Sequence, residues 1–221
     1  MTPLVKICGL STAAALDAAL AAGADMVGFV FFEKSPRHVS FEAARALGRQ
    51  ARGRARVVGL TVDADDALLA EVVDALDPDV LQLHGREDPE RVRAVGARFG
   101  RATMKAIGVS GRQDLAAALA YEEAADLLLI DAKPPKGAVL PGGNGLMFDW
   151  RLARDFAPRR PWLLSGGLQP ENVAEAIRAT GARGVDVSSG VERAPGVKDE
   201  AKIAAFVAAA RAAFRAPAGV A

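Results

Sequence analysis

Two residues with reactive side chains each end an otherwise apolar segment of the chain. Cys8 ends the run 4–8, and Asp131 ends the run 126–131. A cysteine thiolate can attack as a nucleophile or remove a proton, and Lys6, on the same strand face, would favour the thiolate. A partly buried carboxyl group can act as a general acid. Both residues also have an ordinary interpretation, as a small buried apolar group and as a helix cap or salt-bridge partner.

Three more polar side chains follow apolar segments and could bind a ligand. Arg37, in Ser35-Pro36-Arg37, could bind a carboxylate through two parallel hydrogen bonds. Gln82 and His84 alternate with Leu83 at the end of the run 80–84, so they share a face. The alternatives are a solvated loop arginine and polar side chains with a structural role.

Glycine and serine follow the last two apolar segments of the chain. Glycine allows main-chain N–H groups to approach a phosphate closely, and a helix N-terminus adds a favourable potential. Two such turns after the seventh and eighth strands are typical of phosphate-binding barrels. The sequence therefore predicts a phosphate site formed by Gly166, Gly167, Ser188, Ser189 and Gly190.

A long segment without a helical or strand pattern, 132–147, follows Asp131. Loops of this length are usually functional or disordered. Its glycines are typical of a flap that closes on a substrate. We predict a flexible loop that contains Gly142, Gly143, Asn144 and Gly145.

The rest of the chain alternates between short apolar runs and segments with helical spacing. The runs expected to be strands are 4–8, 25–32, 55–62, 80–84, 102–107, 126–131, 161–165 and 184–187. The segments expected to be helical are 12–22, 40–52, 65–76, 88–99, 112–121, 149–156, 170–180 and 199–214. This alternation predicts an α/β protein, a single (β/α)8 TIM barrel with a parallel eight-stranded core over residues 1–221.

An open, doubly wound sheet is the competing fold. The first strand, however, ends in Cys8-Gly9-Leu10, which lacks the glycine pattern of dinucleotide-binding folds. In a barrel the carboxyl ends of all strands meet at one face, where active sites are found. We therefore expect the residues singled out above to surround one cavity.

Composition limits the partners. The 221 residues carry a formal net charge of +1 with scattered basic residues, which argues against nucleic acid or an anionic membrane. A single cysteine excludes an intramolecular disulfide and common cysteine-based metal motifs, and we expect no metal. The sequence shows no signal-peptide or membrane-spanning pattern, so we expect a cytoplasmic protein.

Together these features predict a barrel enzyme that acts on a small phosphorylated substrate. A candidate base and a candidate acid would face each other across the mouth of the barrel. Such an arrangement favours proton transfer, as in an isomerisation, over hydrolysis or redox chemistry.

The chain resembles the phosphoribosylanthranilate isomerases along essentially its whole length. The segments that carry the resemblance are, in order, Lys6-Ile7-Cys8-Gly9, Ser35-Pro36-Arg37, Gln82-Leu83-His84-Gly85, Asp131, Pro141-Gly142-Gly143-Asn144-Gly145, Phe148-Asp149-Trp150, Ser165-Gly166-Gly167-Leu168, Asp186-Val187-Ser188-Ser189-Gly190-Val191-Glu192 and Pro195-Gly196-Val197-Lys198-Asp199. Any one of these could arise by chance, but the ordered set is highly specific.

The resemblance implies an Amadori rearrangement of N-(5-phosphoribosyl)anthranilate in tryptophan biosynthesis. Asp131 would protonate the ring oxygen as the general acid, and Cys8 would remove the proton from C2 as the general base. Arg37 would hold the anthranilate carboxylate, and the two glycine- and serine-rich turns would hold the phosphate. No cofactor is expected, because the protonated imine is itself the electron sink. A monomer and a homodimer are both compatible with the sequence.

Three positions depart from the family's pattern, namely His38, Thr61 and Asn144. A related aldose–ketose isomerase of histidine biosynthesis would have an aspartate in place of Cys8 and an internal two-fold repeat. A ribulose-phosphate epimerase would need metal-binding histidines. A non-catalytic phosphate-binding barrel could keep the glycine- and serine-rich turns without Cys8 or Asp131. These are the alternative functions.

Overall fold

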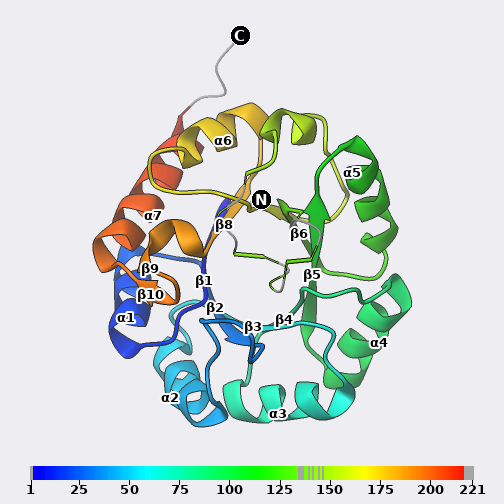
Figure 1. Ribbon diagram of the computed structural model, residues 1–221, viewed down its shortest axis with the longest axis vertical. Coiled ribbons are helices and arrows are strands. Elements are labelled where there is room, and N and C mark those ends of the chain that lie inside the picture. Colours follow the sequence, from blue (N-terminus) through cyan, green and yellow to red (C-terminus); the bar gives the residue numbers. More distant parts are fainter. Residues whose placement is uncertain are drawn as a thin grey trace.

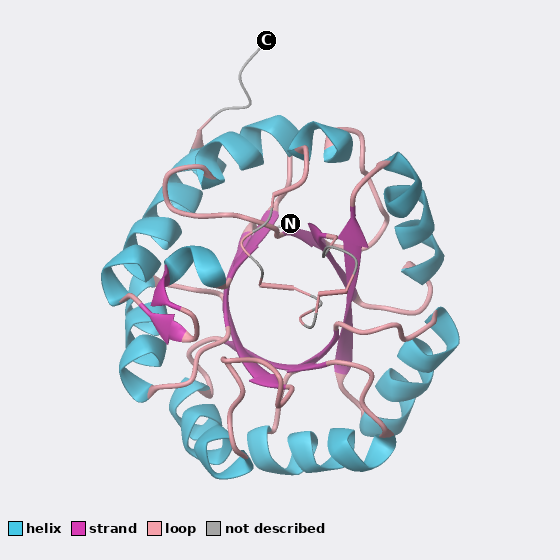
Figure 2. Ribbon diagram, in the orientation of Figure 1, coloured by secondary structure: helices cyan, strands magenta, loops and turns pink. Residues whose placement is uncertain are grey.

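Eight strands close into a barrel in chain order, and each neighbouring pair is parallel. The computed structural model describes residues 2–133, 137, 138, 140, 142, 143, 145 and 147–216. Figures 1 and 2 show the strands as an inner ring with the helices arranged around it. The (β/α)8 barrel predicted from the alternating pattern is thus confirmed.

The strands lie close to where their apolar runs predict them. They are β1 (Leu4–Cys8), β2 (Met26–Phe31), β3 (Arg56–Thr61), β4 (Val80–Leu83), β5 (Ala102–Val109), β6 (Leu127–Ala132), β7 (Trp162–Leu164) and β8 (Gly184–Val187). Parallel strands in a barrel are covered on both faces, which is why these runs are almost wholly apolar.

The α-helices also begin and end near the predicted residues. They are α1 (Ala13–Ala22), α2 (Phe41–Ala51), α3 (Asp66–Leu76), α4 (Pro89–Phe99), α5 (Arg112–Ala118), α6 (Val173–Thr180) and α7 (Glu200–Arg215). Many of these helices begin after a capping residue whose side chain accepts the backbone N–H of the residue three positions later. The capping residues are Thr12, Ser40, Asp65, Asp88 and Asp199. No helix in the described part of the chain is long and apolar enough to cross a membrane.

The sixth helical segment, predicted over 149–156, is wrong as an α-helix. The chain forms only a short 3-10 helix there, η2 (Trp150–Ala153), and a second, η1 (Leu119–Tyr121), extends α5. Asp149 accepts the N–H of Arg151, two residues on, which begins a tighter turn than an α-helix. Phe156 then packs edge-on against Trp162, with ring centroids 5.3 Å apart. One partly buried turn therefore covers this part of the barrel.

A small hairpin between β8 and α7 was not expected from the sequence. It follows the 3-10 helix η3 (Ser189–Val191) and consists of β9 (Glu192–Ala194) and β10 (Val197–Lys198), which are antiparallel. In Figure 1 the hairpin lies outside the strand ring, near α1 and α7. Gly196 has a φ of 78°, and a Cβ there would lie 2.3 Å from the carbonyl oxygen of Pro36. The hairpin therefore packs directly on the loop that carries Arg37.

The amino ends of the strands repeat one stabilising contact. Asp25, Asp79 and Asp126 each precede a strand and accept the backbone N–H of the second residue of the preceding strand, at 2.6, 2.7 and 2.8 Å. Charge-assisted bonds of this kind tie neighbouring strands together. They lie at the end of the barrel opposite the cavity, where side chains generally serve stability.

The barrel interior changes character along its axis. The part nearer the amino ends of the strands is an apolar cluster that contains Met26, Val58, Val80, Met104, Ala106, Leu127, Leu129 and Leu163. Towards the carboxyl ends the inward side chains become polar and charged, including Lys6, Gln82, Asp131 and Asp186, all of them buried. Burying such groups is costly unless each has a partner, so the partners are informative.

Candidate active site

One cavity at the carboxyl ends of the strands brings together most of the residues predicted from the sequence. Those that line it are Cys8, Arg37, Gln82, His84, Asp131, Gly142, Gly143, Gly145, Gly166, Gly167, Ser188 and Ser189. Gly190 is not among the lining residues, and Asn144 lies outside the described residues. The strands place these groups together because parallel strands in a closed barrel all end at the same face.

Cys8 ends β1 on the inner face of the barrel and is buried. Gly28 of the neighbouring strand leaves room for it, since a Cβ there would lie 3.0 Å from the Cys8 Sγ. Burial raises the pKa of the Cys8 thiol; the positive charges of Lys6 and Lys198 oppose this rise, and Asp186 adds to it. Lys6 therefore favours the thiolate, as expected, but burial outweighs it and the thiol is the resting form.

Lys6 lies beneath Cys8 and is completely buried. Its Nζ donates to Asp186 Oδ1 at 2.7 Å, and Ser165 Oγ donates to Asp186 Oδ2 at 3.2 Å. Burial lowers the pKa of Lys6, but Asp186 and Cys8 outweigh this effect, so the pKa lies above its usual value. Asp186 was not singled out from the sequence, although a carboxylate between Val185 and Val187 in an apolar strand was the available signal.

Asp131 ends β6 on the inner face, and its carboxylate is held by two contacts. Oδ1 accepts the N–H of Ala132 at 2.8 Å, and Oδ2 lies 3.5 Å from His84 Nε2. Lys133, two residues after Asp131, pairs with Asp114 at 2.9 Å and not with Asp131. Oδ2 of Asp131 is therefore directed towards the cavity and His84.

Gln82 and His84 share the inner face of the barrel wall at β4, as their alternation predicts. Gln82 Nε2 lies 3.1 Å from His84 Nδ1, so a donating amide would leave the ring proton on Nε2, the nitrogen nearest Asp131. Gln82 Oε1 is buried and has no hydrogen-bond partner within the described ranges. A Cβ at Gly142 would lie 2.6 Å from Asp131 Oδ2, so glycine lets the loop backbone reach this pair.

Arg37 is buried, contrary to the picture of a solvated loop arginine. Its Nε donates to Glu192 Oε1 at 2.7 Å and its Nη2 to Glu192 Oε2 at 2.9 Å, and Nη2 also lies 3.2 Å from the carbonyl oxygen of Gly143. The side chain crosses Gly9, where φ is 73° and a Cβ would lie 2.6 Å from Arg37 Cδ. The sequence predicted that Arg37 binds a ligand carboxylate; in this structure a carboxylate of the chain itself, Glu192 of the hairpin, is bound to Arg37.

The two glycine- and serine-rich turns meet at the other side of the cavity. Gly166 and Gly167 have φ values of 86° and 66°, which glycine adopts readily. A Cβ at Gly190 would lie 1.9 Å from the carbonyl oxygen of Leu168. Gly190 thus lets the turn after β8 pack on the turn after β7, which explains why it supports the cavity without lining it.

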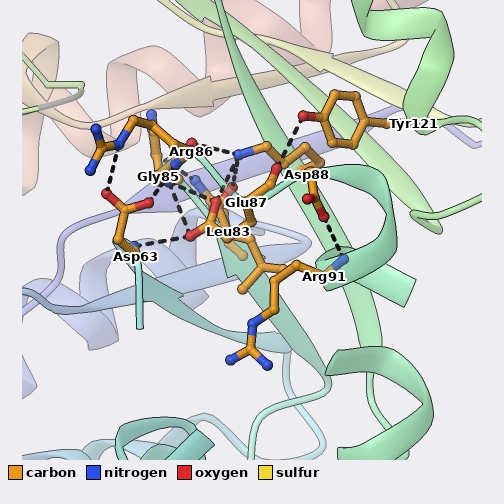
Figure 3. A network of polar contacts seen from close by, with 11 residues as sticks. Asp63, Leu83, Gly85, Arg86, Glu87, Asp88, Arg91 and Tyr121 are labelled. Carbon is orange, nitrogen blue, oxygen red and sulfur yellow. Dashed lines mark hydrogen bonds and ion pairs between the residues drawn. The ribbon is translucent and has the colours of Figure 1, made fainter. Parts of the chain in front are cut away.

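A second polar network lies behind the cavity wall, where β3, β4 and β5 end. Lys105, on the outer face of β5, donates to Glu87 Oε2 at 2.8 Å and to the carbonyl oxygen of Gly85 at 2.7 Å. Glu87 Oε1 accepts the N–H of Asp63 at 3.0 Å, and Tyr121 donates to the Glu87 carbonyl at 3.0 Å. Figure 3 shows Glu87 at the centre of these contacts. They hold the turn that follows His84.

A metal site requires several side chains that can act as ligands to lie close together. Within the described ranges, no group of three or more His, Cys, Asp or Glu side chains is arranged to hold a metal ion. The polar groups that line the mouth of the cavity include Arg37, Cys8, Asp131 and the two turns.

Comparison with known proteins gives a consistent result. Residues 5–209 match the family model described as N-(5'-phosphoribosyl)anthranilate (PRA) isomerase. The N-(5'-phosphoribosyl)anthranilate isomerase of Rhodopseudomonas palustris strain HaA2 is 61% identical over 212 residues, covering 96% of this chain and 97% of the relative. That of Beijerinckia indica is 59% identical over 211 residues, covering 96% and 95%.

Solved structures agree with the sequence comparison. The crystal structure of phosphoribosyl anthranilate isomerase from Thermotoga maritima is similar with a TM-score of 0.84 and 38% identity, covering 96% of this chain and all of that one. A phosphoribosyl anthranilate isomerase in complex with reduced 1-(o-carboxyphenylamino)-1-deoxyribulose 5-phosphate has a TM-score of 0.81 and 36% identity, with coverage of 96% and 100%.

Proposed function

This chain belongs to the N-(5'-phosphoribosyl)anthranilate isomerase family, and we propose that Cys8 and Asp131 are its catalytic base and acid. It is an aldose–ketose isomerase that converts N-(5-phosphoribosyl)anthranilate into 1-(2-carboxyphenylamino)-1-deoxyribulose 5-phosphate in tryptophan biosynthesis. The observation that supports the assignment of the pair is their placement: both end strands on the inner face of the barrel and line one cavity with Arg37 and the two turns.

The reaction begins at the ring oxygen of the sugar. Asp131 donates its proton to that oxygen, the C1–O bond breaks, and the anilino nitrogen lone pair forms a protonated imine at C1. The Cys8 thiolate then removes the proton from C2, and the C–H electrons form the C1=C2 bond of the enolamine as the imine accepts charge. Tautomerisation, with a proton delivered to C1, gives the ketone at C2. We propose no cofactor, since the imine is the electron sink.

The neighbours of Asp131 suit the role of an acid that must be reprotonated. His84 Nε2 lies 3.5 Å from Asp131 Oδ2 and Gln82 Nε2 lies 3.1 Å from His84 Nδ1. We propose that Gln82 fixes the ring orientation and that His84 holds the Asp131 carboxyl group towards the substrate. Gln82 Oε1 is an available acceptor for a sugar hydroxyl group.

The two anionic ends of the substrate require separate sites. The glycine- and serine-rich turns at Gly166, Gly167, Ser188 and Ser189 are the proposed phosphate site, because their backbone can approach an anion closely and α6 begins just beyond. Arg37 is the proposed partner of the anthranilate carboxylate. Gly142 and Gly143 belong to the loop that we propose closes over the substrate.

The remaining expectations follow from the sequence. We propose that residues 1–221 form one domain and that the protein acts in the cytoplasm on a small, soluble phosphorylated substrate. A monomer and a homodimer are both compatible with the sequence.

The test is the loss of anthranilate-like fluorescence when purified protein is added to freshly made N-(5-phosphoribosyl)anthranilate without metal or cofactor. We expect rapid loss with the native chain. In Cys8→Ser and Asp131→Asn we expect a decrease in kcat of about 100- to 10,000-fold, the usual range for a proton-transfer group. A Cys8→Ser variant with near-native kcat would overturn the base assignment. No turnover by a folded native chain that binds a phosphorylated analogue would favour a phosphate-binding barrel or another sugar-phosphate isomerase.

A further inference from the structure

Arg37 is in contact with a buried ion pair, Glu192 and Lys198, that the proposed chemistry does not use directly. Glu192 Oε1 accepts from Arg37 Nε at 2.7 Å and from Lys198 Nζ at 2.8 Å. Glu192 Oε2 accepts from Arg37 Nη2 at 2.9 Å and from the N–H of Gly196 at 3.2 Å. The relative exposures of the Arg37, Glu192 and Lys198 side chains are 7%, 5% and 1%. Of the three, only Arg37 lines the cavity.

The hydrogen bonds of this cluster leave one nitrogen of Arg37, Nη1, for a ligand. Glu192 occupies the Nε and Nη2 side of the guanidinium group, and both of its oxygens already accept two bonds. Nη1 makes no hydrogen bond to any residue that the structure describes. A Cβ at Gly143, on the cavity wall, would lie 2.8 Å from Nη1. Glu192 therefore orients Arg37 with Nη1 towards the loop and the cavity, while Nη2 also donates to the carbonyl oxygen of Gly143 at 3.2 Å.

A paired arginine alone would be a poor anion site. Arg37 and Glu192 together carry no net charge, and a substrate carboxylate next to them would meet a nearby negative group as well as a positive one. Lys198 changes this balance, because two cations and one carboxylate sum to +1. Lys198 is also tied to the cavity edge, donating to the carbonyl oxygen of Ser188 at 2.8 Å and lying 3.3 Å from Ser188 Oγ.

The pKa values of Glu192 and Lys198 both lie below their usual values. Burial lowers the pKa of Lys198, and Glu192 and Cys8 oppose this decrease without cancelling it. Burial works to raise the pKa of Glu192, but the hydrogen bonds and charges of Arg37 and Lys198 outweigh it, so the pKa lies below its usual value. Glu192 therefore remains ionised and keeps holding Arg37. The other charged neighbour, Lys202, bonds the Glu192 carbonyl at 2.9 Å rather than its carboxylate.

We infer that Glu192 and Lys198 of the β9–β10 hairpin are positioning residues that make Arg37 selective for a carboxylate: Glu192 orients the guanidinium group, and Lys198 restores the positive charge that Glu192 cancels. This inference rests on the proposed role of Arg37. It explains why a hairpin outside the barrel packs on the loop that carries Arg37.

The test compares two ligands that differ only in the carboxylate. One is reduced 1-(o-carboxyphenylamino)-1-deoxyribulose 5-phosphate, and the other is the same compound with a plain phenylamino group. The ratio of their dissociation constants measures the preference for the carboxylate. A variant that merely loosens the hairpin would weaken both ligands together and leave this ratio unchanged.

We expect a ratio of about ten or more in the native chain and near one in Arg37→Met, since a charge-assisted contact is worth at least about a tenfold change in affinity. In Lys198→Gln, which keeps an N–H donor for Glu192, we expect the ratio to decrease at least about threefold. Lys198→Met serves in its place if that variant does not fold. The matched control is Lys105→Met. Lys105 is also a buried lysine that pairs with a glutamate at a distance of 2.8 Å, but neither residue of this pair lines the cavity.

The outcomes separate the two levels of the proposal. An unchanged ratio in a folded Lys198 variant, with a lost ratio in Arg37→Met, would overturn this inference alone. An equal decrease of the ratio in Lys105→Met would also overturn the inference, because the effect would then not require a lysine on the cavity side of the barrel. If the native chain does not turn over N-(5-phosphoribosyl)anthranilate, the proposed function fails instead, whatever the ratios are.

Discussion

Two buried lysine–glutamate pairs lie on different sides of the barrel mouth, and their chemistry is almost the same. Lys198 and Glu192 are 2.8 Å apart with exposures of 1% and 5%, and Lys105 and Glu87 are 2.8 Å apart with exposures of 4% and 4%. Glu192 uses its remaining acceptor sites on Arg37, which lines the cavity. Glu87 uses its remaining sites on the backbone of the β3 and β4 turns.

The difference shows that a buried ion pair is neither structural nor functional by itself. The pair Lys105–Glu87 is electrically balanced and faces the helices, so it stabilises turns. The cluster around Glu192 contains two cationic side chains and one carboxylate. It lies against the cavity, so it can attract an anion. Two features separate the regions: the surplus positive charge around Glu192, and the presence of Arg37, which brings that charge to the cavity wall.

The largest expected effect is on stability, at the pair that does not line the cavity. Lys105→Met leaves Glu87 buried without its cation, which typically costs about 3–5 kcal/mol of the free energy of unfolding. Because Lys105 lies outside the barrel wall, we expect kcat of the folded variant to stay within about twofold of native. Urea unfolding monitored by fluorescence, together with the turnover assay, checks both parts. A hundredfold lower kcat in a fully folded variant would remove the distinction between the two regions.

The next effect is on activity, at the cavity side. Arg37→Met removes the proposed partner of the substrate carboxylate, and we expect kcat/KM to decrease by about 100-fold, or about 2.7 kcal/mol. Glu192 keeps Lys198 and the N–H of Gly196, so the loss in stability should be smaller than in Lys105→Met. Steady-state kinetics and urea unfolding on one preparation measure the two quantities. If the free energy of unfolding decreased by more than the free energy of transition-state binding, Arg37 would belong with the structural pair Lys105–Glu87.

A third prediction concerns the pH dependence of the base. Burial raises the pKa of Cys8, so the thiol predominates at neutral pH and the thiolate fraction increases as pH rises. We therefore expect kcat/KM to increase with pH above neutrality. Lys6 lowers this pKa, so Lys6→Met should raise it further, move the rising limb to higher pH and decrease kcat/KM at pH 7 by about tenfold.

The pH–rate profiles of the native chain and of Lys6→Met check this prediction. The control is Lys105→Met, whose lysine also pairs with a carboxylate but is not among the groups that affect the pKa of Cys8. A profile of Lys6→Met that is lower at every pH but not displaced would mean that Lys6 supports the barrel interior without acting on the thiol.

The smallest effect is expected at an exposed ion pair, which sets the baseline for both buried regions. Arg45 and Asp74 are 2.5 Å apart, but their side chains are 48% and 73% exposed. Water screens such a pair, so Arg45→Ala should change the free energy of unfolding by less than about 1 kcal/mol. Urea unfolding in low and high salt measures this change. A loss as large as in Lys105→Met would show that burial does not govern the cost.

Much of the fold, and the placement of Cys8 and Asp131 at strand ends, followed from local sequence pattern, whereas their proposed catalytic roles came from the family resemblance. The strand periodicity placed Lys6 with Cys8 and Gln82 with His84 on the inner face, and β1 and β8 begin and end where their apolar runs do. The prediction of an α-helix over 149–156 was wrong, because Asp149 accepts the N–H of Arg151, two residues on, and the chain forms only a 3-10 turn there.

The sequence by itself determined which residues alternate and where strands end, because periods of 2 and 3.6 residues are properties of neighbouring positions. It could not determine which charges meet. Lys6 pairs with Asp186 across 180 positions and Arg37 with Glu192 across 155. These partners become neighbours only when β8 closes against β1 and the hairpin folds onto the loop after β2. The tertiary structure decided them because burial of a charge demands a partner but does not specify where in the sequence it lies.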